Sequence, residues 1–231
     1  ERADHFAYVS GYPDGTVRPQ GDITRAEVAT IFFCLLQDDA REQVWSTHDS
    51  FTDVLPNRWY SNRIATMSNA GMMIGYPDGT FRPNSKITRA EFATVAAGFF
   101  HAPEVSDDAF SDISNSWARD YINRAAALGL VSGDDDGKFR PNDYITRAEV
   151  MAILNRVLFR TPDKDHLLPD MITWPDNNDT GKWYYADVQE ATNSHDYERV
   201  DNKSPETWTK INPPRDWDAL EKELAQKYPG K

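Results

Sequence analysis

Cysteine is nearly absent from this sequence, and positive charge is scarce. The one cysteine, Cys34, lies in an apolar run, so neither a disulfide framework nor a Cys-x-x-Cys metal motif can be drawn from it. Lysine and arginine together number 25 against 37 aspartates and glutamates, and the net charge is −12. This balance argues against a general nucleic-acid-binding protein and against adhesion to an anionic membrane through charge alone.

Long apolar runs are missing as well. No stretch is long enough to span a bilayer, so we predict no membrane insertion. The sequence begins at Glu1 with no signal peptide, and we therefore expect a piece of a longer protein whose export signal lies elsewhere. Aromatic residues make up 12% of the chain, which is enough to supply a core.

Residues that bind metals or catalyse reactions are present, but they form no motif. A calcium-binding loop with Gly137 at its sixth position would begin at Ser132 and end at Asp143, where such a loop needs an acid and a glutamate. No nucleophile elbow or phosphate-binding loop is found. The five histidines show no ligand spacing: His5, His48, His101, His166 and His195. We therefore predict no catalytic residue, no cofactor and no metal.

A repeated stretch, Ile-Thr-Arg-Ala-Glu, is the main feature that is present. Its three copies begin at Ile23, Ile87 and Ile145. Each copy follows a glycine-led block, and these blocks begin at Gly11, Gly75 and Gly133. The spacings, 75 − 11 = 64 and 133 − 75 = 58 residues, are typical of a protein built from repeated structural units.

Each copy predicts a turn followed by a capped helix. In the first copy, Pro13-Asp14-Gly15 is a turn signal in which glycine takes the positive φ. Thr24 and Glu27 have the spacing of a capping box, which recurs in the other two copies. The residues that follow are apolar almost all round, so we predict three buried helices, at about 24–37, 88–100 and 146–159.

A different helix precedes the second and third turns. It follows a Phe-x-Asp motif, carries a tryptophan and ends at glycine, over residues 59–71 and 117–129. Residues 174–195 repeat this half with no capped helix after it, so the chain holds three of each helix in circularly permuted order. We predict that this C-terminal half completes a lobe begun by the N-terminal half. The predicted units are 1–50, 51–109, 110–170 and 171–231.

The two ends of the chain are less patterned. Phe6, Tyr8 and Val9 indicate a strand or an anchoring arm. In residues 197–231 the aromatic and proline residues indicate a surface strap that includes Trp208. Asp216 is placed to cap a short amphipathic helix from Trp217 to Tyr228.

The repeating unit resembles the S-layer homology (SLH) domain over about residues 8–195. Residues 51–91 carry its motif almost completely, 110–149 nearly so, and 11–27 carry the second half. The resemblance implies a mostly helical, pseudo-threefold assembly of three lobes with the second helices bundled at the centre. It also implies an extracellular role at the bacterial cell wall or S-layer. There the chain would anchor a surface protein non-covalently by binding a secondary cell-wall polysaccharide, often one with pyruvylated N-acetylmannosamine, in grooves between lobes.

The copies depart from that pattern in two places. The third turn, 133–137, has three aspartates and lacks the Tyr-Pro pair of the other turns. The C-terminal half unit has Trp-Pro-Asp in place of Phe-x-Asp and His195 in place of the helix-ending glycine. We therefore expect the three grooves to be unequal.

The candidate ligand-binding residues follow from the chemistry of a pyruvylated sugar. Its carboxylate suits the amino end of a capped helix, where an arginine fork adds charge-assisted hydrogen bonds. Tryptophan offers an apolar face to a sugar ring, and glycine allows a close approach of the backbone. The candidates are Arg25, Arg89, Arg147, Asp53, Asp112, Trp59, Trp117, Trp183, Gly11, Gly75 and Gly133.

Structural roles compete with each of these assignments. The threonine and glutamate of each repeat are most simply caps, the tryptophans can be core residues, and Asp53, Asp112 and Asp176 can brace a helix or bind an arginine. The function hypothesis is a polysaccharide-binding wall anchor that does not bind nucleic acid. The alternatives are a protein–protein docking or assembly module, a wall hydrolase, and a spacer that has lost its ligand.

Overall fold

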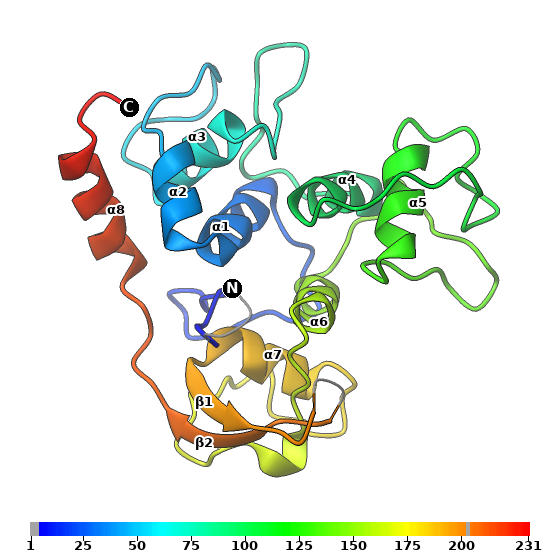
Figure 1. Cartoon of the computed structure of the whole chain (residues 1–231), viewed down its shortest axis with the longest axis vertical. Coiled ribbons are helices and arrows are strands. Elements are labelled where there is room, and N and C mark those ends of the chain that lie inside the picture. Colours follow the sequence, from blue (N-terminus) through cyan, green and yellow to red (C-terminus); the bar gives the residue numbers. More distant parts are fainter. Residues whose placement is uncertain (1–4, 202–203) are drawn as a thin grey trace. The chain divides into compact units, whose positions relative to one another are not determined.

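The computed structural model describes residues 5–201 and 204–231, and this part of the chain is mainly helical (Figure 1). The helices are α1 (Arg25–Leu35), α2 (Asp38–Val44), α3 (Ser61–Asn69), α4 (Arg89–Phe99), α5 (Arg119–Ala127), α6 (Arg147–Val157), a 3-10 turn (Lys164–His166), α7 (Tyr185–Thr192) and α8 (Trp217–Lys227). Strands β1 (His195–Glu198) and β2 (Thr207–Ile211) form one antiparallel pair. The prediction of a mostly helical fold is confirmed, and the threefold bundle stays a prediction.

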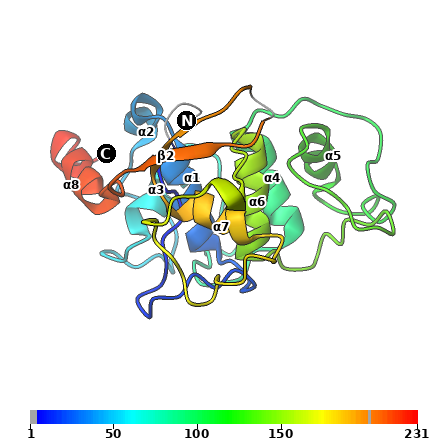
Figure 2. The same ribbon diagram turned by 90° about the horizontal axis from the view of Figure 1, so that it is seen from below.

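The chain forms two compact units, each assembled from distant segments. The first unit joins Glu1–Asp22 to Thr146–Arg215, and the second joins Ile23–Ile145 to Asp216–Lys231. Within the second unit α3 packs on α1, and α5 packs on α4 (Figure 1). Within the first unit α7 packs on α6, and the view turned by 90° shows the same pairing (Figure 2). Each capped helix thus packs on one of the other predicted helices. Those helices begin two residues after Trp59, Trp117 and Trp183, so the predicted starts at the tryptophans were wrong.

All three predicted capping boxes are present. At α1 the Thr24 hydroxyl accepts from the Glu27 amide, and the Glu27 carboxylate accepts from the Thr24 amide at 2.8 Å. The same reciprocal pairs open α4 and α6. Two of the four free amides at each helix start are thereby satisfied, which is why the repeated stretch starts a helix at the same place each time.

The isoleucines that open the repeated stretch close a ring inside the second unit. The Ile23 amide donates to the Ile145 carbonyl at 3.1 Å, Ile87 donates to Ile23 at 3.0 Å, and Ile145 donates to Ile87 at 3.3 Å. All three side chains are buried. Backbone hydrogen bonds therefore join these three isoleucines to one another.

The polar insert after α1 folds back on that helix. Arg41 in α2 is buried, and its guanidinium donates to the Phe33, Cys34 and Leu36 carbonyls at the carboxyl end of α1. These contacts satisfy carbonyls that the helix itself leaves unpaired. Cys34 is buried and forms no disulfide, as its apolar surroundings indicated.

The predicted C-terminal helix is confirmed. α8 begins at Trp217, and the Asp216 carboxylate accepts from the Ala219 amide at 2.9 Å. Arg63 of α3, itself buried, donates to Glu221 of α8 at 2.5 Å. α8 is therefore fastened to α3 on the second unit, and of its own residues only Glu221 and Leu224 are buried.

The first unit differs from the sequence-based predictions at its ends. Helix α7 stops at Thr192, short of the predicted 195, because the Thr192 and Asn193 side chains bond carbonyls of its last turn. Trp208 lies buried in β2, so it is not part of a surface strap. Residues 6–9 form no strand; they are an arm whose Tyr8 hydroxyl donates to Asn155 of α6 at 2.6 Å.

Candidate functional site

The three glycine-led turns share one backbone geometry. Tyr12, Tyr76 and Asp134 each donate an amide to a carbonyl four residues later, at 2.7–2.8 Å. The turn glycines Gly15, Gly79 and Gly137 have φ of 79, 80 and 75°, which confirms the predicted left-handed position. Three arginines also take positive φ, of 50 to 59°, at positions 18, 82 and 140. Positive φ is unfavourable for arginine, so contacts with residues outside each turn must stabilise this backbone conformation.

One aspartate holds each turn. Asp53 accepts from the amides of Phe81 and Arg82 at 2.7 and 2.8 Å. Asp112 does the same for residues 139 and 140, and Asp176 for residues 17 and 18. Burial would raise the pKa of Asp112, but its two backbone hydrogen bonds lower that pKa below the ordinary value. The candidates Asp53 and Asp112 thus brace their turns.

The candidate arginines lie across the bases of these turns. Arg25 donates to the carbonyls of Phe81 and Ile74 at 2.8 and 2.9 Å, and it pairs with Glu91 at 3.3 Å. The equivalent carbonyl contacts of Arg89 are to residues 139 and 132, and those of Arg147 are to residues 17 and 10. Each arginine therefore ties the start of a capped helix to a turn. Sequence reasoning missed this structural role.

Two arginines lie over one tyrosine ring at two of the turns. The Arg25 guanidinium is 4.8 Å from the Tyr76 ring centre and that of Arg82 is 3.9 Å from it. In the first unit Arg147 and Arg18 lie 4.7 and 3.9 Å from the Tyr12 ring. Two cations are thus gathered on one aromatic ring. The Tyr-Pro pair was noted in the sequence, but its tyrosine was not among the predicted site residues.

The third turn lacks this arrangement. Asp134 replaces the tyrosine, and Arg140 pairs with Asp134 and with Asp136, the latter at 3.1 Å. Arg89 lies over the Phe139 ring at 4.8 Å, as Arg25 lies over the Phe81 ring at 4.7 Å, so the contact missing from this turn is the one with a tyrosine ring. The turn is therefore acidic where the other two carry an aromatic ring.

The candidate tryptophans are exposed. Their exposed fractions are 53% for Trp59, 68% for Trp117 and 62% for Trp183. Trp59 and Trp183 pack edge-on against the tyrosine that follows each of them, at 5.3 Å. This exposure excludes the core interpretation and leaves the rings open to a partner.

The candidate glycines lie against aromatic side chains of the chain itself. A Cβ added to Gly75 would stand 2.3 Å from the Phe51 ring, one on Gly11 2.1 Å from Trp174, and one on Gly133 2.7 Å from Phe110. Each ring belongs to the Phe-x-Asp motif or its Trp-Pro-Asp variant. The space that glycine leaves beside the backbone is thus occupied by an aromatic side chain of the protein and not by a ligand.

The structure therefore gathers the candidate arginines, aspartates and glycines into three local clusters. The ring contacts described above link the candidate tryptophans Trp59 and Trp183 to neighbouring tyrosines and not to these clusters. Arg25, Asp53 and Gly75 meet at the turn 75–82. The second cluster, at the turn 133–140, contains Arg89, Asp112 and Gly133. The third, in the first unit, contains Arg147, Gly11 and the aspartate Asp176.

Comparison with known proteins agrees with the repeat. Residues 7–29, 50–93 and 109–151 match the S-layer homology domain. Cell surface glycoprotein 1 of Acetivibrio thermocellus is 37% identical over 212 residues, which are 87% of this chain and 9% of the relative. The Cellulosome-anchoring protein of that organism is 36% identical over 205 residues, 86% of this chain and 45% of the relative. The S-layer protein of Bacillus licheniformis is 34% identical over 145 residues, 61% of this chain and 16% of the relative.

The chain spans less than half the length of each of these relatives. None of the helices in the described part combines the length and the apolar character that a bilayer crossing needs. The predicted location at the cell surface or in the cell wall agrees with the family and with these relatives. The three matching segments carry the repeated turn and capped helix described above, and the chain therefore belongs to the S-layer homology domain family.

Proposed function

We propose that this chain is a non-catalytic anchor that attaches a longer surface protein to the bacterial cell wall by binding a wall polysaccharide. Support comes from the relatives, among which are a protein named for cellulosome anchoring and an S-layer protein. The observation that carries the proposal is the pair of arginines on one tyrosine ring at the turn 75–82. In a chain of net charge −12, an anionic ligand needs such a local concentration of positive charge.

The exposed member of the pair makes the first contact with the ligand. The Arg82 side chain is 47% exposed and pairs with Asp78 at 2.8 Å, whereas Arg25 is buried. A surface ion pair of this kind contributes little, so a ligand carboxylate can replace it at small cost. Arg82 therefore binds the ligand, and Arg25 positions the turn.

The ligand that fits best is a sugar bearing a pyruvyl ketal. Its carboxylate suits a guanidinium, which forms bidentate charge-assisted hydrogen bonds. The exposed Trp59 offers an apolar face to a sugar ring in the same unit. By the same argument the tyrosine-bearing turns bind, and the acidic turn 133–140 repels the anion.

Closure of the chain is part of this proposal. The C-terminal half unit completes the N-terminal one, with the unit boundaries 1–50, 51–109, 110–170 and 171–231. Support comes from Asp176, which holds the turn at residues 17 and 18 as Asp53 holds its own, and from Trp174 against Gly11. Deleting residues 171–231 should lower the melting temperature of the remaining chain, and an unchanged melting temperature would contradict closure.

Sedimentation with purified cell-wall sacculi tests the anchor. Arg82→Gln should weaken binding about 10- to 100-fold, because a hydrogen bond to a charged group contributes about 1.5–3 kcal/mol. The matched control is Arg140→Gln, at the same position of the acidic turn, which should bind like the unchanged chain. Equal binding by all three proteins would overturn the role of this turn. Circular dichroism checks that both variants fold.

The pyruvyl group is tested separately by removing it chemically from the sacculi. Binding that survives its removal would reject the pyruvyl ligand and keep the anchor. A chain that binds no wall preparation would instead favour the docking module. The exposed Trp59, Trp117 and Trp183 are the observation that supports that second candidate.

A further inference from the structure

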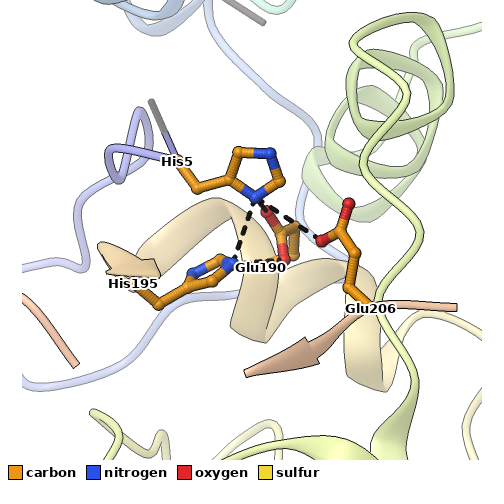
Figure 3. Close-up of side chains that lie close together, drawn as sticks. All are labelled: His5, Glu190, His195 and Glu206. Carbon is orange, nitrogen blue, oxygen red and sulfur yellow. Dashed lines mark hydrogen bonds and ion pairs between the residues drawn. The ribbon is translucent and has the colours of Figure 1, made fainter. Parts of the chain in front are cut away.

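The first unit contains a buried cluster of metal-ligating side chains that the wall-anchor function does not use. Figure 3 shows His5, Glu190, His195 and Glu206 pointing toward one another. They come from the N-terminal arm, from α7, from β1 and from the residue before β2. All four side chains have no solvent exposure. We propose that these four residues form a structural site for a divalent transition metal, with zinc as the best-suited ion.

The distances fit one small cation. The Nδ1 atom of His5 is 3.1 Å from Glu190 Oε1 and 3.5 Å from Glu206 Oε2. It is also 3.1 Å from the Nε2 atom of His195, which is 3.3 Å from Glu190 Oε2. A tetrahedral zinc with bonds of about 2.0–2.2 Å places its ligand atoms about 3.3–3.6 Å apart. The four ligand atoms all lie within 4.8 Å of one another, so the more widely separated pairs would have to move closer on binding zinc.

The surrounding contacts orient the ligands. The Nδ1 atom of His195 lies 3.0 Å from the Asn193 carbonyl, which only an N–H can bond, so its Nε2 lone pair faces the cluster. The His195 ring also stacks on Trp208 at 3.9 Å, and the His5 ring stacks on Tyr197 at 4.0 Å. An outer hydrogen bond of this kind typically fixes the tautomer of a metal-bound histidine.

Glu206 is held in the same manner. Its Oε1 atom accepts from the Thr161 amide and from Arg199, both at 3.1 Å. Its Oε2 atom and that of Glu190 are buried and have no hydrogen-bond partner among the described residues. A buried carboxylate oxygen without a partner is costly, and a bound cation would remove that cost.

Imidazole nitrogens and carboxylate oxygens are both ligands that zinc accepts. Four buried protein ligands leave no open position for a substrate or water, which is the arrangement of a structural rather than a catalytic zinc site.

The proposed site joins distant parts of the chain. His5 and His195 are 190 residues apart and also form an isolated backbone bridge. A bound metal would fasten the N-terminal arm to α7 and to the hairpin, so metal binding would stabilise the fold of the first unit.

The full chain, freed of metal with a chelator and dialysed, should bind one zinc ion per molecule in calorimetry and melt at a higher temperature with zinc. Cobalt should give the strong visible absorption of a tetrahedral site. Glu206→Gln keeps the shape of the side chain and should lower zinc affinity at least tenfold, as should His5→Gln. His166→Gln, which changes a half-exposed histidine paired with Asp163, is the matched control and should bind zinc normally.

A folded chain that binds no zinc or cobalt would overturn the proposal and make the cluster a hydrogen-bonded network. Equal zinc affinity of the unchanged chain and Glu206→Gln would also overturn it. If His5→Gln does not fold, the proposal is still tested by the cobalt spectrum of the unchanged chain and by the zinc titration of Glu206→Gln. Wall binding by Arg82→Gln is a separate measurement, so the two proposals fail independently.

Discussion

Two turns of the second unit, 75–82 and 133–140, hold their backbones alike and differ in chemistry. In both, an aspartate accepts two successive amides at 2.7–2.8 Å, and the turn arginine has a φ of 54–59°. In the first turn the residue after the opening glycine is Tyr76, whose ring has two arginines over it. In the second it is Asp134, which pairs with Arg140.

The comparison separates the residues that build the fold from those that set its chemistry. The bracing aspartate, the glycine and the helix cap are retained where the tyrosine is lost. A turn can therefore keep its structural place in the repeat and change its charge, since the tyrosine position contributes no backbone constraint of its own.

The largest expected difference concerns the opening glycines. Gly75→Ala should destabilise the fold by about 3 kcal/mol and Gly133→Ala by about 1–2 kcal/mol, within the range for overpacking. The added Cβ would stand 2.3 Å from Phe51 and 2.6 Å from the Thr80 carbonyl, whereas the contacts at Gly133 are 2.7 and 2.9 Å. Urea unfolding measures both values.

The control for this pair is Gly98→Ala in α4. A Cβ at Gly98 meets no atom within 4 Å, and alanine is favoured over glycine in a helix by about 1 kcal/mol. This variant should therefore be neutral or more stable. Equal losses of unfolding free energy in Gly75→Ala and Gly133→Ala would show that the two turns are packed equally tightly. That result would contradict the difference in contact distances between them.

A smaller loss of stability is expected when the hydroxyl of Tyr76 is removed. Tyr76 donates to Glu91 Oε1 at 2.6 Å, and Glu91 also caps α4. Tyr76→Phe should cost about 1 kcal/mol of stability, the usual value of one hydrogen bond, and keep the ring beside both arginines. Asp134→Asn, which weakens a surface ion pair, should cost less.

Wall sedimentation sharpens this prediction. Tyr76→Asp, which copies the acidic turn, should weaken binding to sacculi far more than Tyr76→Phe. If the two variants bound equally, the ring would have no part in gathering the arginines.

The smallest effect concerns pH. The Thr80 hydroxyl, Arg82 and the Thr80 amide lower the pKa of Asp78 to about 2, below the ordinary value near 3.9. The contribution of this carboxylate is therefore complete above about pH 4 and is lost as the pH falls through about 2. Because Asp78 is exposed, the effect on global stability is small.

Carboxyl NMR titration of Asp78 measures this directly and should give a midpoint near 2. In Arg82→Gln the midpoint should rise, because the guanidinium that donates a hydrogen bond to the Asp78 carboxylate at 2.8 Å is removed. A midpoint near 3.9 in the unchanged chain would show that the turn is open in solution.

Much of the local structure could be predicted because its causes lie within a few residues. The Thr24 and Glu27 pair starts α1, Gly79 takes its positive φ, and Asp216 caps α8. The exposure of Trp59 and the position of Arg25 across a turn could not be predicted, because both depend on segments that meet only in the folded chain.

The sequence by itself determined the repeat, its turns, its caps and its family, since hydrogen bonds between near neighbours and a recurring motif are visible in the order of residues. Only the tertiary structure decided which residues share a site. His5 and His195 have no spacing that identifies them as a pair in the sequence. The Nδ1 atom of His5 lies 3.1 Å from the Nε2 atom of His195 because the N-terminal arm returns to the hairpin. Contacts between distant segments depend on how the whole chain packs, and that information is not held in any one stretch.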